Sequence, residues 1–261
     1  DSISKKMISE CKKQYDDNKN IPPNLYSKYI QVVSQSEQTW QKAKSDNDFK
    51  TMVPYLKEII ELTKEMYSYS KPNVDTYNAL LDDYEKGITE NQLDTIFKEL
   101  KEGTIPLIEA ISKKDKVNQH IFNGHYPIHL QERLSNYFLD VINFDFKSGC
   151  LSQSEHPFTT GINSPYDVRI TTNYDINDIR SSLFSVLHEG GHAIYEQNIN
   201  PKLVGTRLNT GTSMGIHESQ SRFYENIIGR NLSFWKKHYN KVCEILPSYS
   251  NISLDKFYKG I

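Results

Sequence analysis

The sequence predicts a mainly α-helical protein. Over most of the first 115 residues, apolar side chains recur at intervals of three and four, which is the spacing of one buried helix face. The same spacing returns over residues 130–144 and again from residue 179 onward. Only residues 167–172 combine β-branched side chains with the alternation of a strand. At 261 residues, the chain is long enough for one large domain or two small ones.

The first part of the chain divides at recognisable breaks. Residues 21–24, Ile-Pro-Pro-Asn, end the first helix, and a long helix over residues 25–44 follows. Residues 47–48 offer a cap for a third helix, which the break at residues 71–73 closes, and residues 89–92 have the pattern of a capping box. We expect the apolar stripes of the third helix and of the helix after residue 89 to be core: Met52, Leu56, Ile59, Ile60, Leu62 or Met66, and Leu93, Ile96, Phe97 and Leu100.

The pattern of the sequence changes after residue 144 from helical spacing to turn-forming residues. Residues 130–144 predict a helix, and residues 146–165 are rich in turn formers. They lead into the strand predicted at residues 167–172. A further helix then begins, with Asn177 or Asp178 as its cap.

The composition describes a rather polar globular chain and excludes several classes of partner. Hydrophobic residues make up 37% and charged residues 25%, and the formal net charge is -2. Because lysines are interleaved with acids, no basic patch favours nucleic acid. No apolar run reaches the roughly 18 residues that a membrane-spanning helix needs. Cys11, Cys150 and Cys243 are odd in number and widely spaced, which argues against disulfides and thiolate zinc sites and favours a reducing, cytoplasmic location.

Residues 188–192 read His-Glu-Gly-Gly-His and lie on the helix predicted after residue 178. One helical turn separates the two imidazoles, so His188, Glu189 and His192 share a face. Two imidazoles and a carboxylate from elsewhere suit Zn²⁺ and leave a position open for water, as in catalytic zinc sites. Glu218, 26 residues beyond His192, is the candidate third ligand. The alternative is a pair of ordinary surface histidines, but the helical context favours a metal site of a zinc peptidase.

Four further residues are candidates for binding substrate or for holding the ligands in place. Glu225 shares nearly the same helical face as Glu218 and either orients a metal-bound imidazole or is a solvated glutamate. Arg169 either binds a substrate carboxylate or pairs with a neighbouring acid and fixes the strand. His156 and His217 either hydrogen-bond to substrate or brace the site. We also hypothesise that the edge of the predicted strand pairs with the backbone of an extended peptide.

Four motifs in this order resemble those of the Taq-type (M32) metallocarboxypeptidases, and the similarity extends upstream over nearly the whole chain. The motifs are His156-Pro157-Phe158, Asp167-Val168-Arg169-Ile170-Thr171, the run from His188 to Gln197 and the run from His217 to Asn226, and the upstream matches are Pro54-Tyr55-Leu56 and Tyr77 to Glu85.

The resemblance implies a mainly α, multi-helix fold similar to the neurolysin-like zinc peptidases, with a small β-sheet beside the active-site groove. We expect residues 1–261 to be a single, partial catalytic domain, helical over residues 1–145 and metal-binding over residues 146–261. Family members run beyond the last residue of this chain, and two of their further motifs have no match in it. The sequence is therefore expected to be a fragment, with the arginine for the substrate carboxylate and the oxyanion donors in the missing part.

The implied activity is that of a zinc-dependent carboxypeptidase acting on peptide C-termini. On the family pattern, His188, His192 and Glu218 bind one Zn²⁺, or Co²⁺ in its place, and Glu189 is the general base. The expected partners are peptides and a second copy in a homodimer, with no nucleic acid and no membrane. Two alternatives stay open, namely a zinc endopeptidase or oligopeptidase, and a metal-binding fragment without turnover.

Overall fold

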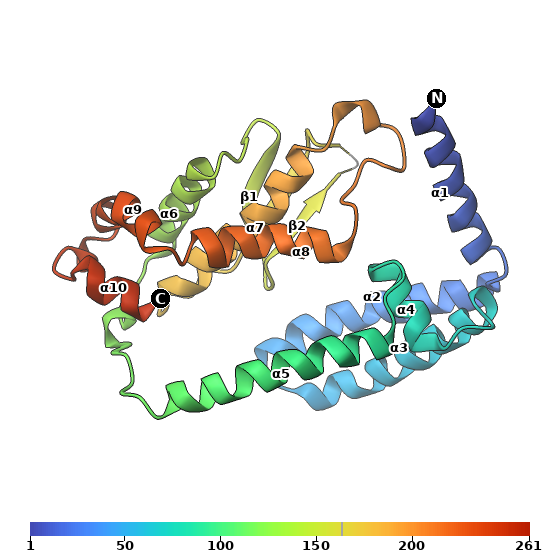
Figure 1. The fold of residues 1–261 in the computed structure, drawn as a ribbon, viewed down its shortest axis with the longest axis horizontal. Helices are drawn as coiled ribbons and strands as arrows, with labels where there is room; N and C mark the ends of the chain where they lie inside the picture. The colour runs from blue at the N-terminus through green and yellow to red at the C-terminus, as the bar shows by residue number, and fades with distance from the viewer. Residues whose placement is uncertain (163) are drawn as a thin grey trace. The chain divides into compact units, whose positions relative to one another are not determined.

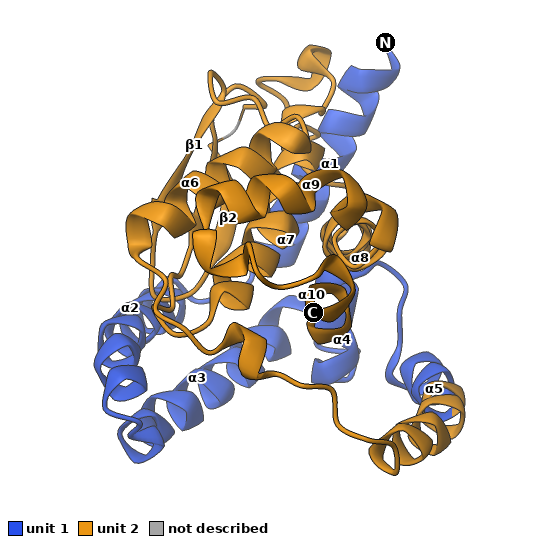
Figure 2. Cartoon of the chain, turned by 90° about the vertical axis from the view of Figure 1, so that its left-hand side faces the viewer, with its two compact units in different colours: residues 1–98 blue, residues 99–261 orange. Residues whose placement is uncertain are grey.

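The computed structural model describes residues 1–162 and 164–261. The chain separates into two compact units, residues 1–98 and residues 99–261, and the boundary falls inside helix α5 (Figure 1, Figure 2). The expected single catalytic domain, with its change of character at residue 145, stays a prediction.

The first unit is built from helices. In it, α2 and α3 pack against each other around a small core of Leu25, Val32 and Leu62. The other helices of the unit add little to this core, because α1 has no buried residue and α4 has only Ala79. The helices are α1 (Ser2–Asn18), α2 (Pro23–Ser45), α3 (Phe49–Ser70), α4 (Thr76–Tyr84) and the first part of α5 (Glu90–Ser112).

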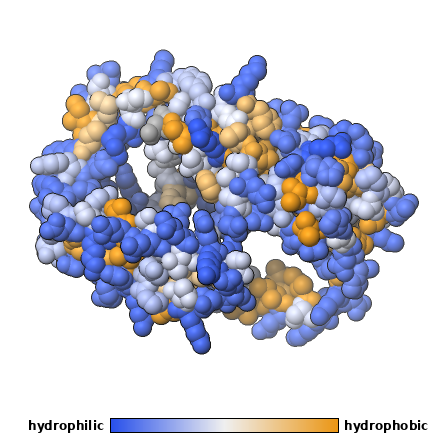
Figure 3. Space-filling model, turned by 180° about the vertical axis from the view of Figure 1, so that it is seen from behind, coloured by the Kyte–Doolittle hydropathy of each residue, from blue (hydrophilic) through white to orange (hydrophobic). Residues whose placement is uncertain are grey.

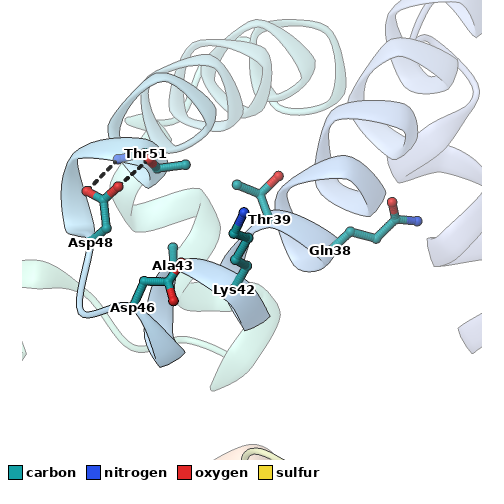
Figure 4. Close-up of a pocket in the computed structure, with 7 residues that line it drawn as sticks. All are labelled: Gln38, Thr39, Lys42, Ala43, Asp46, Asp48 and Thr51. Atoms are coloured by element: carbon teal, nitrogen blue, oxygen red, sulfur yellow. Dashed lines mark hydrogen bonds between the residues drawn. The ribbon is translucent and has the colours of Figure 1, made fainter.

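Two predicted helix caps of this unit are confirmed. Asp48 caps α3 by accepting hydrogen bonds from the backbone N–H and the hydroxyl of Thr51, at 3.4 and 2.6 Å. The Thr89 N–H donates to Gln92 Oε1 at 2.9 Å, and the Gln92 N–H donates to Thr89 Oγ1 at 3.4 Å, which is the reciprocal pair of a capping box. Figure 4 shows the Asp48 cap and the pocket beside it, lined by Gln38, Thr39, Lys42, Ala43, Asp46, Asp48 and Thr51.

Helix α5 departs from the prediction. The sequence predicts its apolar stripe to be core, but Ile96, Phe97 and Leu100 are 52%, 48% and 59% exposed. No residue of the helix is buried. The amphipathic pattern specifies an apolar face but not the element that covers it, and for this stripe the core prediction is wrong. Exposed apolar side chains are visible as orange areas on the face drawn in Figure 3.

The second unit contains the sheet, whose strands run in the order β1-β3-β2. Strand β3 (Val168–Thr172) pairs in parallel with β1 (Gly149–Gln153) and antiparallel with β2 (Phe158–Gly161). The sequence predicts only the central strand. Because both edges of β3 are already paired, the hypothesis that this strand binds an extended peptide is wrong, and β2 is an outer strand instead.

The helices of the second unit enclose a large aromatic core. Trp235, Tyr249, Phe122, Phe138 and Phe257 are its largest fully buried side chains. The helices are the rest of α5, α6 (Ile128–Val141), α7 (Ile179–Gln197), α8 (Met214–Arg222), α9 (Leu232–Ile245) and α10 (Leu254–Gly260), with a π-helical turn (Phe223–Ile228) after α8 and 3₁₀ turns at His120–Phe122, Pro201–Leu203 and Pro247–Tyr249. The mainly α fold with a small sheet is thus confirmed. Among the described residues, no helix is long and apolar enough to cross a membrane.

Candidate metal centre

The His-Glu-Gly-Gly-His segment lies in the middle of α7, which packs against α6, α8 and the sheet. The helix begins at its predicted cap, where Asp178 accepts the backbone N–H of Arg180 at 2.9 Å. Gly191 allows α8 to come close: a Cβ atom at this position would lie 2.8 Å from the Cα of Ser221 and 2.9 Å from the carbonyl oxygen of Gln220. The close approach of the two helices brings residues of α8 beside the imidazoles of α7.

Within residues 1–162 and 164–261, one group of metal-type donors converges, and it is His188, His192 and Glu218. Their ligand atoms lie within 4.8 Å of one another. Oε2 of Glu218 is 3.6 Å from Nε2 of His188 and 3.4 Å from Nε2 of His192. Two imidazole nitrogens and one carboxylate oxygen make a donor set that fits a divalent metal with a position left for substrate or water.

The other nitrogen of each imidazole is already engaged. Nδ1 of His188 lies 2.9 Å from Oε2 of Glu225, and Nδ1 of His192 lies 2.6 Å from Nδ1 of His217. Both Nε2 atoms are therefore the ones free to face a metal. Burial, together with the nearby charges of His217 and His188, lowers the pKa of His192 to about 4, so this imidazole is neutral at pH 7 and has a lone pair to offer.

The Glu218 carboxylate is held by its two neighbours on α8. Arg222 Nε donates to Oε1 at 2.8 Å, and the Ser221 hydroxyl lies 3.1 Å from Oε2. Partial burial acts to raise the pKa of Glu218, but the hydrogen bond from Arg222 and the charge of His188 outweigh it and lower the pKa. The side chain is therefore ionised at neutral pH, as a metal ligand must be.

Glu189 lies beside this group but is not part of it. Its side chain is 7% exposed, and burial raises the pKa of its carboxyl group. The hydroxyl of Thr159 on β2 lies 2.8 Å from Oε2 and 2.9 Å from the backbone oxygen of Glu189, and this contact partly opposes the rise. The contact leaves Oε1 available for a proton.

The remaining candidates lie in different surroundings. Arg169 is exposed on β3 and makes two 2.9 Å hydrogen bonds to Asp167. His156 is exposed in the turn before β2, and its charge acts to lower the pKa of Glu189. His217 lies between His192 and Glu196, so its ring contacts the metal group through another imidazole.

Sequence reasoning missed Thr159, Glu196, Ser221 and Arg222. Ser221 and Arg222 follow Glu218 on its own helix, and Glu196 is one turn beyond His192, so helical spacing could have identified them. Thr159 is different, because it lies on β2, a strand of only four residues whose sequence shows no recognisable alternation of apolar and polar side chains.

A family model and several known proteins match this chain over nearly its whole length. A family model described as Carboxypeptidase Taq (M32) metallopeptidase matches residues 1–261. Carboxypeptidase 1 of Bacillus subtilis strain 168 is 44% identical over 260 residues, which is 99% of this chain and 52% of that protein. Thermostable carboxypeptidase 1 of Thermus thermophilus is 35% identical over 97% of this chain and 52% of that protein. The chain spans about half the length of these curated relatives.

Solved structures show the same fold. The BsuCP crystal structure superposes with a TM-score of 0.94 at 44% identity, covering 98% of this chain and 52% of that one. The M32 carboxypeptidase from Deinococcus radiodurans R1 superposes with a TM-score of 0.89 at 28% identity, covering 100% of this chain and 52% of that one.

Proposed function

This chain belongs to the carboxypeptidase Taq (M32) metallopeptidase family, and we propose that it carries the metal site and general base of an enzyme that removes C-terminal residues from peptides. The observation that carries the proposal is the convergence of His188, His192 and Glu218 beside a buried Glu189. Named carboxypeptidases among the relatives support it, at 44% and 35% identity.

Family membership implies a divalent metal, and we propose one Zn²⁺ per chain, with Co²⁺ as a substitute. Two imidazole nitrogens and one carboxylate suit a borderline-soft cation such as Zn²⁺ better than Mg²⁺ or Ca²⁺, which prefer oxygen ligands. Glu225 and His217 hold the imidazoles of His188 and His192 by their Nδ1 atoms. A metal bound there supplies a Lewis acid that polarises the scissile carbonyl and eases deprotonation of water.

Glu189 moves the proton in this proposal. Its Oε2 is held by Thr159, so Oε1 takes the proton from the attacking water and later gives it to the nitrogen of the departing amino acid. The raised pKa of Glu189 brings its proton affinity closer to neutral pH, which favours both transfers.

The substrate backbone is best placed along β2. Within the part of the chain that the structure describes, this strand pairs on one side only, with β3, and its Thr159 contacts the general base. An extended peptide paired with the free edge would run beside Glu189. Arg169 is less suited to bind the terminal carboxylate, because its guanidinium already makes two hydrogen bonds to Asp167.

We further propose a cytoplasmic location and a homodimer, as the family resemblance implies. The three cysteines are free, which fits a reducing compartment.

Light scattering of the purified protein measures directly whether it is a dimer. A monomer at micromolar concentration would contradict that part of the proposal.

The activity is tested with an acetylated peptide and its C-terminally amidated form. A carboxypeptidase releases the last residue of the free acid and leaves the amide intact. Equal cleavage of both would instead support a zinc endopeptidase or oligopeptidase. Bound zinc without cleavage of either would support a metal-binding fragment that needs residues beyond this chain.

The Glu189→Gln variant tests the general base. We expect its zinc content to be unchanged and its turnover to fall by about 10²- to 10⁴-fold, the usual contribution of a general base. Turnover near the wild-type value would remove Glu189 from this role.

A further inference from the structure

The contacts around His217 form a continuous chain of three side chains. Nδ1 of His217 lies 2.6 Å from Nδ1 of His192, and Nε2 of His217 lies 2.7 Å from Oε1 of Glu196. His192 and Glu196 are one turn apart on α7, whereas His217 is in the first turn of α8. The imidazole of His217 thus bridges two consecutive turns of the neighbouring helix.

The ring of His217 has little freedom to turn away. The edge-on ring of Tyr195 is 4.9 Å from it, measured between centroids. On another side lies Gly211, where an added Cβ atom would come within 2.5 Å of Cδ2 of His217. The side chains of His217 and Glu196 are only 23% and 15% exposed, so water competes weakly for their hydrogen bond.

The positions of the protons on these three side chains follow from the proposed metal site. If Nε2 of His192 offers its lone pair to a metal, its proton must be on Nδ1, and this N–H donates to Nδ1 of His217. His217 then carries its own proton on Nε2 and donates it to the Glu196 carboxylate. Each contact has one donor and one acceptor, so a single set of tautomers satisfies all three side chains.

We propose that His217 and Glu196 are positioning residues that act through His192, fixing its tautomer and ring orientation and making it a stronger metal ligand. The inference rests on the proposed function, because it assigns Nε2 of His192 to the metal. His188 receives the same support directly from the Glu225 carboxylate. In this arrangement α8 supplies both a ligand, Glu218, and the adjacent residue that orients a second ligand.

Metal affinity and the Co²⁺ absorption spectrum of the 261-residue chain test the proposal without requiring turnover. We expect His217→Phe, which keeps an aromatic ring but neither hydrogen bond, to weaken Zn²⁺ binding by about 10- to 100-fold in competition with a chelator. The visible Co²⁺ bands should change with it. His217→Gln should restore most of the affinity, because its amide can accept from His192 and donate to Glu196.

Two further variants separate the effect of the His192–His217–Glu196 hydrogen bonds from a loss of folding. Glu196→Gln is close in shape and keeps an acceptor for His217, so we expect a smaller loss of affinity than in Glu196→Ala. His238→Gln is the matched control, since His238 is another buried imidazole, bonded to Tyr137 on α6 and outside the metal group. It should leave the affinity and the Co²⁺ bands unchanged.

The outcomes distinguish this inference from the proposed function. A wild-type chain that binds neither Zn²⁺ nor Co²⁺ would contradict the proposed function itself. A wild-type chain that binds metal, with His217→Phe and Glu196→Ala matching its affinity and spectrum, would overturn the inference alone. An equal loss in His238→Gln would also overturn it, because the effect would then come from general destabilisation.

Discussion

Thr159 connects the sheet to the proposed general base through one hydroxyl. The bond to Glu189 is partly buried and involves a carboxylate, and such bonds are worth about 1.5–3 kcal/mol. We expect Thr159→Val to lower kcat by about 10- to 100-fold, because the carboxylate loses the contact that fixes Oε2. Zinc affinity should be unchanged, since Thr159 does not contact the metal group. Steady-state kinetics and chelator competition measure the two quantities.

The neighbouring residue provides the control for this variant. Thr160 is the next residue on β2, so its side chain points to the opposite face of the sheet. Thr160→Val should keep wild-type kcat. An equal loss in both variants would show that the strand, rather than the hydroxyl of Thr159, determines the rate.

At the scale of single residues, the sequence is most informative where one helix carries the pattern. The positions of His188, Glu189 and His192 follow from helical spacing alone. The same spacing places Glu225 near the site, yet this residue lies in a π-helical turn, where the α-helical period does not hold. Its contact with His188 therefore depends on the packing of α7 against this turn, which no local pattern specifies.

Helices α7 and α8 approach so closely at Gly191 that backbone meets backbone. An added methyl group there would contact the Cα of Ser221 and the carbonyl of Gln220, neither of which can rotate away. At Gly190 the same methyl group would meet the ends of the Ile142 and Leu139 side chains. We therefore expect Gly191→Ala to push α8 away and weaken zinc binding by roughly tenfold or more, and Gly190→Ala to have a smaller effect.

Zinc affinity and thermal unfolding of the two variants check this difference. Both substitutions remove a glycine from the interior of the same helix, so their intrinsic helix propensities change alike. Gly190→Ala binding zinc more weakly than Gly191→Ala would contradict the assignment of α8 as the helix that carries the third ligand.

The cap of α7 makes the stability of the second unit depend on pH. Hydrogen bonds from Arg180 lower the pKa of Asp178, against the effect of burial. A lowered folded-state pKa means that the contribution is present above the unfolded-state pKa of about 3.9 and is lost as pH falls through the folded-state value. We expect Asp178→Ala to cost about 1 kcal/mol at neutral pH and less at strongly acidic pH.

The Asp178→Asn variant separates the cap from the charge. Asparagine keeps an acceptor for the Arg180 N–H but cannot ionise, so its free energy of unfolding should lack this part of the acid dependence. Urea unfolding at pH 7, 4 and 2 measures it. A constant difference between wild type and Asp178→Asn over this range would contradict the role of the charge.

At the scale of elements, the sequence predicts those whose pattern is local. The caps of α3, α5 and α7 depend on residues within three positions of each other, and all three are recognisable from the sequence. Strand β3 is recognisable because it alternates and is β-branched, whereas β1 and β2 are short outer strands defined by their pairing with β3. Pairing joins residues distant in sequence, so a single strand pattern could not reveal the sheet.

At the scale of the whole molecule, the exposed stripe of α5 marks the limit of sequence prediction. The pattern correctly identifies an amphipathic helix, but its apolar face is not buried in this chain. The chain spans about half the length of the relatives it matches. What covers such a face depends on tertiary partners, and these are not encoded in the period of the helix.

The two units differ greatly in the size of their cores, and we expect them to differ in stability. Among the described residues, the core cluster of the first unit has three buried residues, whereas that of the second has 22, of which nine are aromatic. Leu62→Ala in the first unit and Leu134→Ala in the second each remove a buried leucine side chain, at a typical cost of about 2–5 kcal/mol in the free energy of unfolding.

Hydrogen exchange should show faster exchange within residues 1–98 for Leu62→Ala, with unchanged zinc affinity. Leu134→Ala should speed exchange in residues 99–261 and weaken zinc binding. Faster exchange along the whole chain in both variants would mean that residues 1–261 unfold as one cooperative unit.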